Sequence, residues 1–358
     1  MNEQERYQQI DVPFYEKNVA PFLPDRVLDF HAHTWKSEHW KEVPWETGKE
    51  GTRYLVTTEQ YGVETLLADG KRIFPDRDYL AVCFGYPTPA AHLEKENDYV
   101  AGAGERPGLF PLYLAGNGLT PIQEIEKTVR DRGFFGYKVF LNWYGDNYSH
   151  VRVRDMLGSD ELKLADRLGL VVLLHVPAAR RLADPLVQEG VKAWSEACPN
   201  ARFVLAHCGR AYHPDEMSQA IGAIADLSNV YMDSSMVMEP QVLQMVLENI
   251  DSSRLLYATD FPVAAMRGRR VYVMDHWVDV VLEGYPPSAF RVAGDNIHAT
   301  FMAWEIALAV KRAADMVKLP ARRLRDIFFE NGIKVLQHVM NGEQYQVAVT
   351  RWQAQAAS

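Results

Sequence analysis

The stretch Val27-Leu28-Asp29-Phe30-His31-Ala32-His33 is an apolar run that ends in two histidines. Alternate side chains of a β-strand point the same way, so His31 and His33 share one face and Ala32 points to the other. The stretch is therefore typical of a strand that presents two metal-binding side chains at its carboxyl end.

Three further apolar runs also end in a residue that can bind a metal ion. Residues 171–174 lead into His175, residues 203–206 into His207, and residues 255–259 into Asp260. Imidazole nitrogens and a carboxylate oxygen suit a borderline divalent ion such as zinc, and three or four of them with an open position make a catalytic site. A single histidine at a strand end is usually a hydrogen-bonded core residue, but the joint pattern favours a metal site.

The spacing of these runs predicts a parallel sheet, because strand-like segments alternate with helical patterns. Helices are expected to begin near residues 120, 159, 184 and 213, three of them with an early proline. The expected strands lie near residues 27–33, 79–85, 109–115, 136–141, 171–177, 202–208, 230–235 and 255–261. Eight such units most simply close into a (β/α)8 barrel, an α/β fold whose chemistry lies at the carboxyl ends of the strands.

Two stretches fall outside this repeat. Residues 34–78 are too long for a simple loop and predict a helical insertion that covers the site. Residues 262–297 carry several Pro, Gly and Arg residues before helical patterns resume over 298–317 and 320–338. With no solenoid repeat or low-complexity linker, we expect residues 1–358 to form one domain, with the barrel over about residues 25–340.

Composition and charge limit the classes of partner. Of 358 residues 47% are hydrophobic, enough for a large core, yet no window approaches the roughly 18 apolar residues of a membrane span. The net charge of −9 without a basic stripe argues against a nucleic-acid partner. The polar residues 1–17 lack a secretory segment and the three cysteines lack CxxC spacing, so we expect a cytoplasmic protein with reduced thiols and no membrane contact.

The motifs described above resemble those of the amidohydrolase superfamily, which carries them in the same strand order. The segments Leu205-Ala206-His207-Cys208-Gly209, Tyr257-Ala258-Thr259-Asp260-Phe261-Pro262 and Glu330-Asn331-Gly332 are most similar to its metal-dependent branch of decarboxylases, lactonases and related hydrolases. The resemblance covers about residues 25–340 and implies a barrel enzyme.

The resemblance also implies roles for individual residues. His31, His33, His175 and Asp260 would hold one divalent metal ion, with Zn²⁺ expected first and Mn²⁺ as the alternative. Such an ion lowers the pKa of a bound water and polarises a substrate carbonyl. Asp260 would accept the proton of that water, and His207 would donate a hydrogen bond to the developing oxyanion or act as a second acid or base.

Lys138 leaves the number of metal ions open. Strand alternation points it inward with Gly136 and Phe140. Binuclear members of the superfamily carry a carbamylated lysine on this strand, and other members keep it unmodified. As an unmodified cation, Lys138 would pair with a buried carboxylate or bind an anionic substrate.

The substrate is expected to be a small, anionic molecule. Arg210 follows His207 by three residues, close enough to bind a carboxylate, although a solvent-exposed loop cation is an equal reading. Some decarboxylases of the branch replace one histidine of the first motif with glutamate, whereas this chain keeps His31 and His33. Hydrolysis of a carboxylate-bearing lactone, amide or related carbonyl compound is therefore the leading hypothesis.

Two alternatives to hydrolysis stay open. The first is a non-oxidative decarboxylase or another lyase that acts on an aromatic or unsaturated acid with the same metal ion. The second is a non-catalytic barrel that serves as a binding subunit. The sequence is also compatible with a homo-oligomer.

Overall fold

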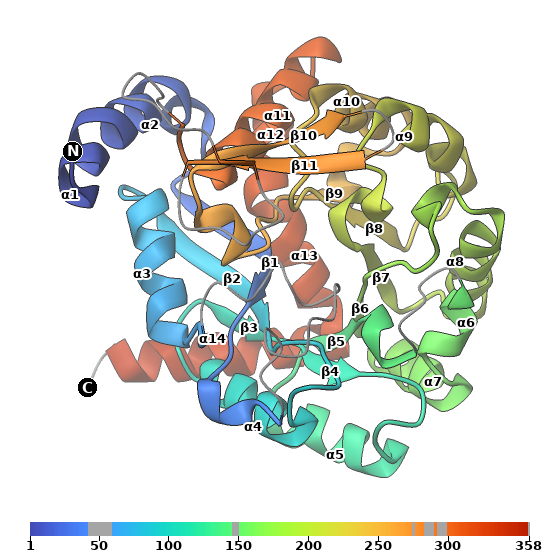
Figure 1. Ribbon diagram of the computed structural model, residues 1–358. Coiled ribbons are helices and arrows are strands. Elements are labelled where there is room, and N and C mark those ends of the chain that lie inside the picture. The colour runs from blue at the N-terminus through green and yellow to red at the C-terminus, as the bar shows by residue number, and fades with distance from the viewer. Residues whose placement is uncertain (42–58, 145–149, 274–275, 283–289, 292–298, 357–358) are drawn as a thin grey trace.

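The computed structural model describes residues 1–41, 59–144, 150–273, 276–282, 290–291 and 299–356 (Figure 1). Helices surround a central group of strands in this structure, and the two N-terminal helices lie outside that group (Figure 1). None of the described helices combines the length and the apolar composition needed to cross a bilayer.

The central strands pair in parallel and form two sheets, in the order β1-β2-β3 and β4-β5-β6-β7-β8-β9. They are β1 (Arg26–His33), β2 (Asp78–Phe84), β3 (Leu109–Pro111), β4 (Tyr113–Ala115), β5 (Gly136–Val139), β6 (Val171–Leu174), β7 (Arg202–Leu205), β8 (Val230–Asp233) and β9 (Leu255–Leu256). Most of their residues are buried, as is usual for parallel strands covered by helices on the outside.

Two seams join these sheets into one ring. At the first seam only Leu112 separates β3 from β4, and its amide donates a hydrogen bond to the carbonyl of Cys83 on β2 at 2.8 Å. At the second seam the amide of Asp260 donates to the carbonyl of His31 at 2.8 Å. Since β3 and β4 together are the third expected strand, the predicted α/β barrel is confirmed.

The helices begin where the sequence predicted them. Asp184 shows why: its carboxylate accepts a hydrogen bond from the Leu186 amide at 2.9 Å, and Pro185 occupies the first helical position. The helices are α1 (Glu3–Arg6), α2 (Val12–Asn18), α3 (Val63–Ile73), α4 (Leu93–Ala103), α5 (Ile122–Arg132), α6 (Val153–Met156), α7 (Ser159–Leu168), α8 (Pro185–Ala197), α9 (Pro214–Ala220), α10 (Pro240–Asn249), α11 (Met302–Met316), α12 (Ala321–Phe328), α13 (Glu330–His338) and α14 (Glu343–Ala356).

The insertion expected over residues 34–78 contains helix α3. This helix contacts β2 and makes the crossover between β1 and β2, so it belongs to the outer layer of the barrel. Residues 42–58 lie outside the described residues, and a cover over the site formed by this segment stays a prediction.

A small sheet follows the last barrel strand, where no strands were expected. It consists of β10 (Gly268–Val273), β11 (His276–Val281) and β12 (Phe290–Arg291), with β10 and β11 antiparallel. Arg270 on β10 lies opposite Asp279 on β11, and their side chains form an ion pair at 2.8 Å. Such cross-strand pairs stabilise a hairpin. The sequence did not predict these strands, because the many Gly, Pro and Arg residues of this segment are typical of a loop.

Side chains from the two ends of the chain pack against the barrel. Near the N-terminus, the buried carboxylate of Asp11 binds the guanidinium of Arg267 at 2.9 Å. Near the C-terminus, the rings of Tyr345 and Trp352 on α14 contact Phe110 on β3, with centroid distances of 6.0 and 5.3 Å. The expected C-terminal helices are thus present and cover part of the barrel.

Candidate metal centre

The barrel brings the histidines and Asp260 to one end of its strands. His31 and His33 end β1, His175 follows β6 directly, His207 follows β7, and Asp260 lies four residues beyond β9. The carboxyl ends of parallel strands meet at the same face of a barrel, which is where barrel enzymes carry their chemistry.

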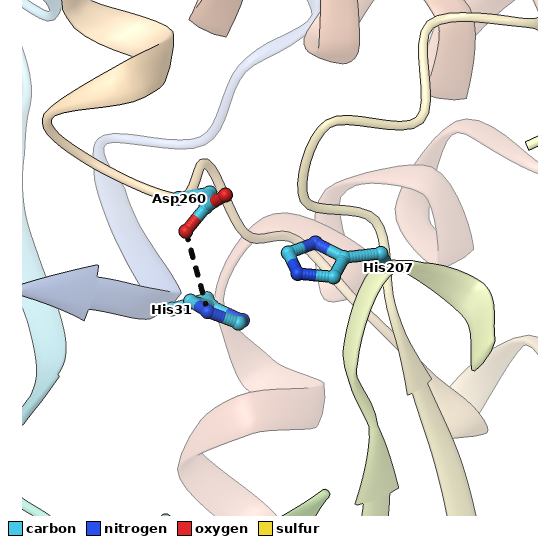
Figure 2. Close-up of side chains that lie close together, drawn as sticks. All are labelled: His31, His207 and Asp260. Atoms are coloured by element: carbon cyan, nitrogen blue, oxygen red, sulfur yellow. Dashed lines mark ion pairs between the residues drawn. The ribbon is translucent and has the colours of Figure 1, made fainter. Parts of the chain in front are cut away.

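Asp260 is the centre of this group. Its Oδ1 atom lies 3.4 Å from Nε2 of His31 and 3.2 Å from Nε2 of His33. Figure 2 shows its carboxylate directed at His31, with the ring of His207 beside both residues. One ligand atom each of His31, His207 and Asp260 lie within 4.8 Å of one another, so these three residues alone could surround a metal ion.

His175 lies next to this group rather than inside it. Its ring is 5.2 Å from the ring of His207 and 4.3 Å from that of Phe140, measured between centroids. Its Nδ1 atom is buried and has no hydrogen-bond partner within the part of the chain that the structure describes. A buried polar atom without a partner is costly, so His175 has a nitrogen available for a ligand.

The partners of two rings determine where their protons are. Nδ1 of His31 lies 2.9 Å from a carboxylate oxygen of Asp233, and Nδ1 of His207 lies 3.2 Å from the carbonyl of Ser235. Carboxylates and carbonyls only accept hydrogen bonds, so in both rings Nδ1 carries the proton and Nε2 keeps a lone pair. His33 lies between two acceptors, the carbonyl of Gly85 at 3.4 Å from Nδ1 and Oδ1 of Asp260 at 3.2 Å from Nε2.

Burial keeps these imidazoles neutral. It lowers the pKa of His31 and of His175 well below 6.5, lowers that of His33, and brings that of His207 to about 3. Burial also works to raise the pKa of Asp260, but the hydrogen bond with His33 and the neighbouring imidazoles outweigh it and leave that pKa lowered.

The donor set therefore fits a divalent metal ion. Nε2 of His31 and Nε2 of His33 both lie within 3.4 Å of Oδ1 of Asp260, so nitrogen and oxygen atoms of the types that bind zinc converge at one point. Neutral imidazoles and an ionised carboxylate are the protonation states that metal binding requires.

The backbone at Asp260 and around His207 adopts conformations that most side chains avoid. Asp260 has a φ angle of +74°, and His207 and Arg210 have φ angles of +56° and +61°. Each such residue costs on the order of 1–3 kcal/mol, and such strain is concentrated at functional sites. Asp and His tolerate this region better than most residues, which suits the residue types found here.

Lys138 is buried inside the barrel, as alternation predicted. Its Nζ atom lies 3.1 Å from Nε2 of His31 and 4.6 Å from the ring centre of Phe84. Burial lowers its pKa to about 8, although the carboxylates of Asp260 and Asp233 work in the opposite direction. Its hydrogen-bonding neighbour is thus an imidazole of the site, not the buried carboxylate that one reading of the sequence expected.

Arg210 lies beside the site and not in open solvent. Its side chain is half-buried, and Nη1 donates a hydrogen bond to the carbonyl of Val176 at 3.0 Å. Burial is the largest cause of the lowered pKa of His175, and the positive charge of Arg210 lowers that pKa further. Arg210 is therefore close enough to the histidines to contact a substrate bound there.

Other arginines near the strand ends are engaged elsewhere. Arg181 forms an ion pair with Glu216 at 2.7 Å, and Arg267 and Arg270 pair with Asp11 and Asp279 as described above. Arg180 is exposed and donates to the side chain of Gln219 at 2.8 Å. Lys138 and Arg210 are therefore the stronger candidates for contacting an anionic substrate.

Asp233 is the site residue that the sequence analysis missed. It is fully buried at the end of β8 and contacts both the His31 ring and the His207 backbone. Its position in the sequence could have revealed it, because Asp233, like Asp260, is a carboxylate at the end of a predicted strand. Two serines follow it: Ser234 bonds backbone atoms of Ala258, whereas Ser235 Oγ lies 2.8 Å from Nδ1 of His207.

The buried histidines predict a pH dependence of stability. Four neutral histidines of the folded site (His31, His33, His175 and His207) would each take up a proton near pH 6.5 in the unfolded chain. The unfolded state then binds more protons, so the free energy of unfolding falls as the pH falls, by up to about 1.4 kcal/mol per pH unit for each histidine.

We expect the metal-free protein to be less stable at pH 5.5 than at pH 7. Buried carboxylates act in the opposite direction, above all Asp29, whose pKa burial raises to about 7 against the hydrogen bonds that it accepts from Thr259, His31 and Tyr79. In this pH interval, however, the unfolded chain takes up the protons of four site histidines. Urea unfolding of chelator-treated protein at both pH values measures the difference. Equal stability at both pH values would contradict neutral histidines in the folded site.

Comparisons with known proteins agree with this geometry. The model of the amidohydrolase family matches residues 28–288. The chain belongs to the amidohydrolase family. Both the family resemblance and the barrel expected from the sequence are therefore confirmed.

Solved structures share the fold of this amidohydrolase at low sequence identity. They include 4-oxalomesaconate hydratase from Rhodopseudomonas palustris, with 15% identity, 93% of this chain and 100% of that chain covered, and a TM-score of 0.55. A putative 2-pyrone-4,6-dicarboxylic acid hydrolase from Pseudomonas putida has 14% identity, coverage of 88% and 99%, and a TM-score of 0.53. An amidohydrolase from Burkholderia multivorans with bound zinc has 15% identity, coverage of 87% and 99%, and a TM-score of 0.53. No curated protein matches the sequence significantly.

Membership in this family supports part of the expected function. Amidohydrolases are enzymes that use a divalent metal ion and act on small molecules, with hydrolases and lyases both represented. The His31, His207 and Asp260 group of this amidohydrolase fits that use.

Proposed function

We propose that this amidohydrolase is a metal-dependent hydrolase that uses an activated water on a small, carboxylate-bearing lactone, amide or related carbonyl compound. The observation that carries the proposal is the convergence of His31, His33 and Asp260, whose Nε2 and Oδ1 atoms lie 3.2–3.4 Å apart and are the ligand types that suit a divalent ion. His207 lies beside this group, with its ring centroid 4.9 Å from that of His31, and His175 lies next to His207 at 5.2 Å.

We assign His31, His33, His175 and Asp260 as the ligands of one divalent ion, most suitably Zn²⁺, with Mn²⁺ as the alternative. The unpartnered Nδ1 of His175 supports the fourth ligand. A divalent ion supplies a Lewis acid that makes water a nucleophile near neutral pH and polarises a carbonyl group.

Asp260 and His207 are the residues that we assign to proton transfer. The lowered pKa of Asp260 keeps its carboxylate ionised, so it can accept a proton from the attacking water and pass it to the leaving group. His207 carries its proton on Nδ1, toward the carbonyl of Ser235, and its Nε2 is an acceptor. This arrangement favours an acid or base role for His207 over donation of a hydrogen bond to an oxyanion.

Lys138 and Arg210 are assigned to the carboxylate of the substrate. Both are cations beside the site histidines, in a chain whose net charge of −9 would otherwise repel an anion. The planar guanidinium of Arg210 can hold a carboxylate through two hydrogen bonds, whereas Lys138 offers a single point charge.

Product analysis in isotopically labelled water tests the proposal. Carboxylated lactones, amides and aromatic acids are screened with Zn²⁺ or Mn²⁺ supplied, and the products of the best substrate are analysed by mass spectrometry. Incorporation of solvent oxygen supports hydrolysis. Release of carbon dioxide without it supports the decarboxylase alternative, and a protein that binds no metal would instead be a non-catalytic barrel.

Arg210→Lys should raise KM for a carboxylate-bearing substrate by roughly tenfold or more, because a charge-assisted bond to a buried carboxylate contributes about 1.5–3 kcal/mol. If the contact is equally strong in the ground and transition states, kcat changes little. Steady-state kinetics on the best substrate measure both constants. Arg180→Lys is the matched control, because Arg180 is exposed and bonds Gln219; unchanged kinetics in both variants would move the anion contact to Lys138.

A further inference from the structure

Asp233 lies between two histidines that come from different strands of the barrel. Its Oδ2 atom is 2.9 Å from Nδ1 of His31, which is 202 positions away in the sequence. Its Oδ1 atom accepts hydrogen bonds from the amides of His207 and Ser235, at 2.7 and 3.0 Å, and from the Ser235 hydroxyl. No part of Asp233 is exposed, so every contact of the carboxylate is with the protein.

The two oxygens of Asp233 therefore have different tasks. Oδ1 is saturated by donors of the chain segment after β7 and β8, which fixes the backbone of His207. Oδ2 faces the ring of His31 and can only accept, which keeps the proton on Nδ1. The opposite nitrogen of that ring, Nε2, is the one that lies 3.4 Å from Asp260.

We propose that Asp233 is a positioning residue for the metal site: it holds His31 in the tautomer with a bare Nε2 and fixes His207 beside it. This inference rests on the proposed function, because it concerns the residues that would hold the ion. A carboxylate that orients a metal-binding histidine also makes the imidazole more basic, and loss of such a partner typically weakens metal binding by about 10–100-fold.

The purely structural alternative is that Asp233 only satisfies buried backbone amides. The two readings differ in what an asparagine would do at this position. Its carbonyl oxygen must take the place of Oδ1, because the amides of His207 and Ser235 need an acceptor. The amide nitrogen then faces Nδ1 of His31 and donates to it. The ring is forced to carry its proton on Nε2, where it cannot bind a metal ion.

The experiment compares the Zn²⁺ affinity of the full chain and its variants by competition with a chromophoric chelator. We expect Asp233→Asn to weaken Zn²⁺ binding by about 10–100-fold. Asp29→Asn is the matched control: Asp29 is equally buried and bonds the His31 amide, but it contacts no imidazole. This control should stay within about threefold of wild type, well short of the change for Asp233→Asn.

The tautomer itself is measured by nitrogen NMR on histidine-labelled, metal-free protein, with His31 assigned from a His31 variant. Wild type should show the proton on Nδ1, and Asp233→Asn should show it on Nε2. An Nε2–H tautomer in wild type would overturn the proposal even if the variant did not fold. A folded Asp233→Asn variant that binds Zn²⁺ like wild type would overturn it as well. If wild type binds no metal ion, the proposed function fails instead.

Discussion

Asp260→Asn should lower kcat by about 10²–10⁴-fold, the usual contribution of a general acid or base. Metal content should fall much less, since the amide oxygen of asparagine can still bind a metal ion but cannot accept a proton from water. The rate and the metal occupancy are therefore expected to separate in this variant.

The structure makes this substitution a clean test. Asp260 has a φ angle of +74°, and asparagine is among the few residues that adopt this conformation readily, so the backbone should be retained. Its contacts with Nε2 of His31 and His33 depend on an oxygen that asparagine also supplies. Loss of activity would then report on chemistry and not on a displaced loop.

The measurement combines kinetics on the best substrate with elemental analysis of the same sample. His207→Asn is the companion variant, because His207 is the other residue assigned to proton transfer. If the loss of rate in Asp260→Asn only follows the loss of metal, Asp260 is a ligand alone, and the proton-transfer role passes to His207.

The double variant His31→Ala and His33→Ala should lose the metal ion almost completely. Wild type is expected to bind about one divalent ion per chain, because four ligands with one open position suit a single catalytic ion. The double variant removes both imidazoles that face Asp260 and leaves that carboxylate without a neighbouring ligand on β1. Activity should disappear with the metal.

Elemental analysis of purified protein measures the stoichiometry, and circular dichroism checks that the variant is folded. The double variant His92→Ala and His150→Ala is the control, since neither residue lies at the strand ends that form the site. Unchanged metal content without His31 and His33 would show that β1 does not carry the site. A wild-type value near two, with extra mass on Lys138, would instead support a binuclear site with a carbamylated lysine.

Much of the fold could be predicted because its causes are local. Apolar runs mark strands, proline marks helix starts, and alternation puts His31 and His33 on one face. All three patterns depend on near neighbours in the chain. The hairpin of β10 and β11 was missed because its stabilising contact, Arg270 with Asp279, joins charged residues that read as a polar loop in the sequence. Helix α3 was assigned to an insertion because the long segment before it hid its role as a crossover.

Some residues of the candidate site could likewise be predicted from local sequence, and others could not. His31, His33, His175, His207 and Asp260 could be found from the sequence because each ends an apolar run, and parallel strands carry their carboxyl ends to one face. The geometry around Lys138 could not, because its neighbour His31 lies on another strand, 107 positions away. Alternation predicted only that Lys138 points inward.

The sequence by itself thus determined which residues end the strands and, through alternation, which of them face the barrel interior. Only the tertiary structure decided which nitrogen of His31 is available, because this depends on partners that closure of the barrel brings together. His31 meets Asp233 from β8 and Asp260 from beyond β9 only after the hydrogen bonds between that last segment and β1 complete the ring. A buried imidazole takes its tautomer from such contacts, and no local pattern in the sequence encodes them.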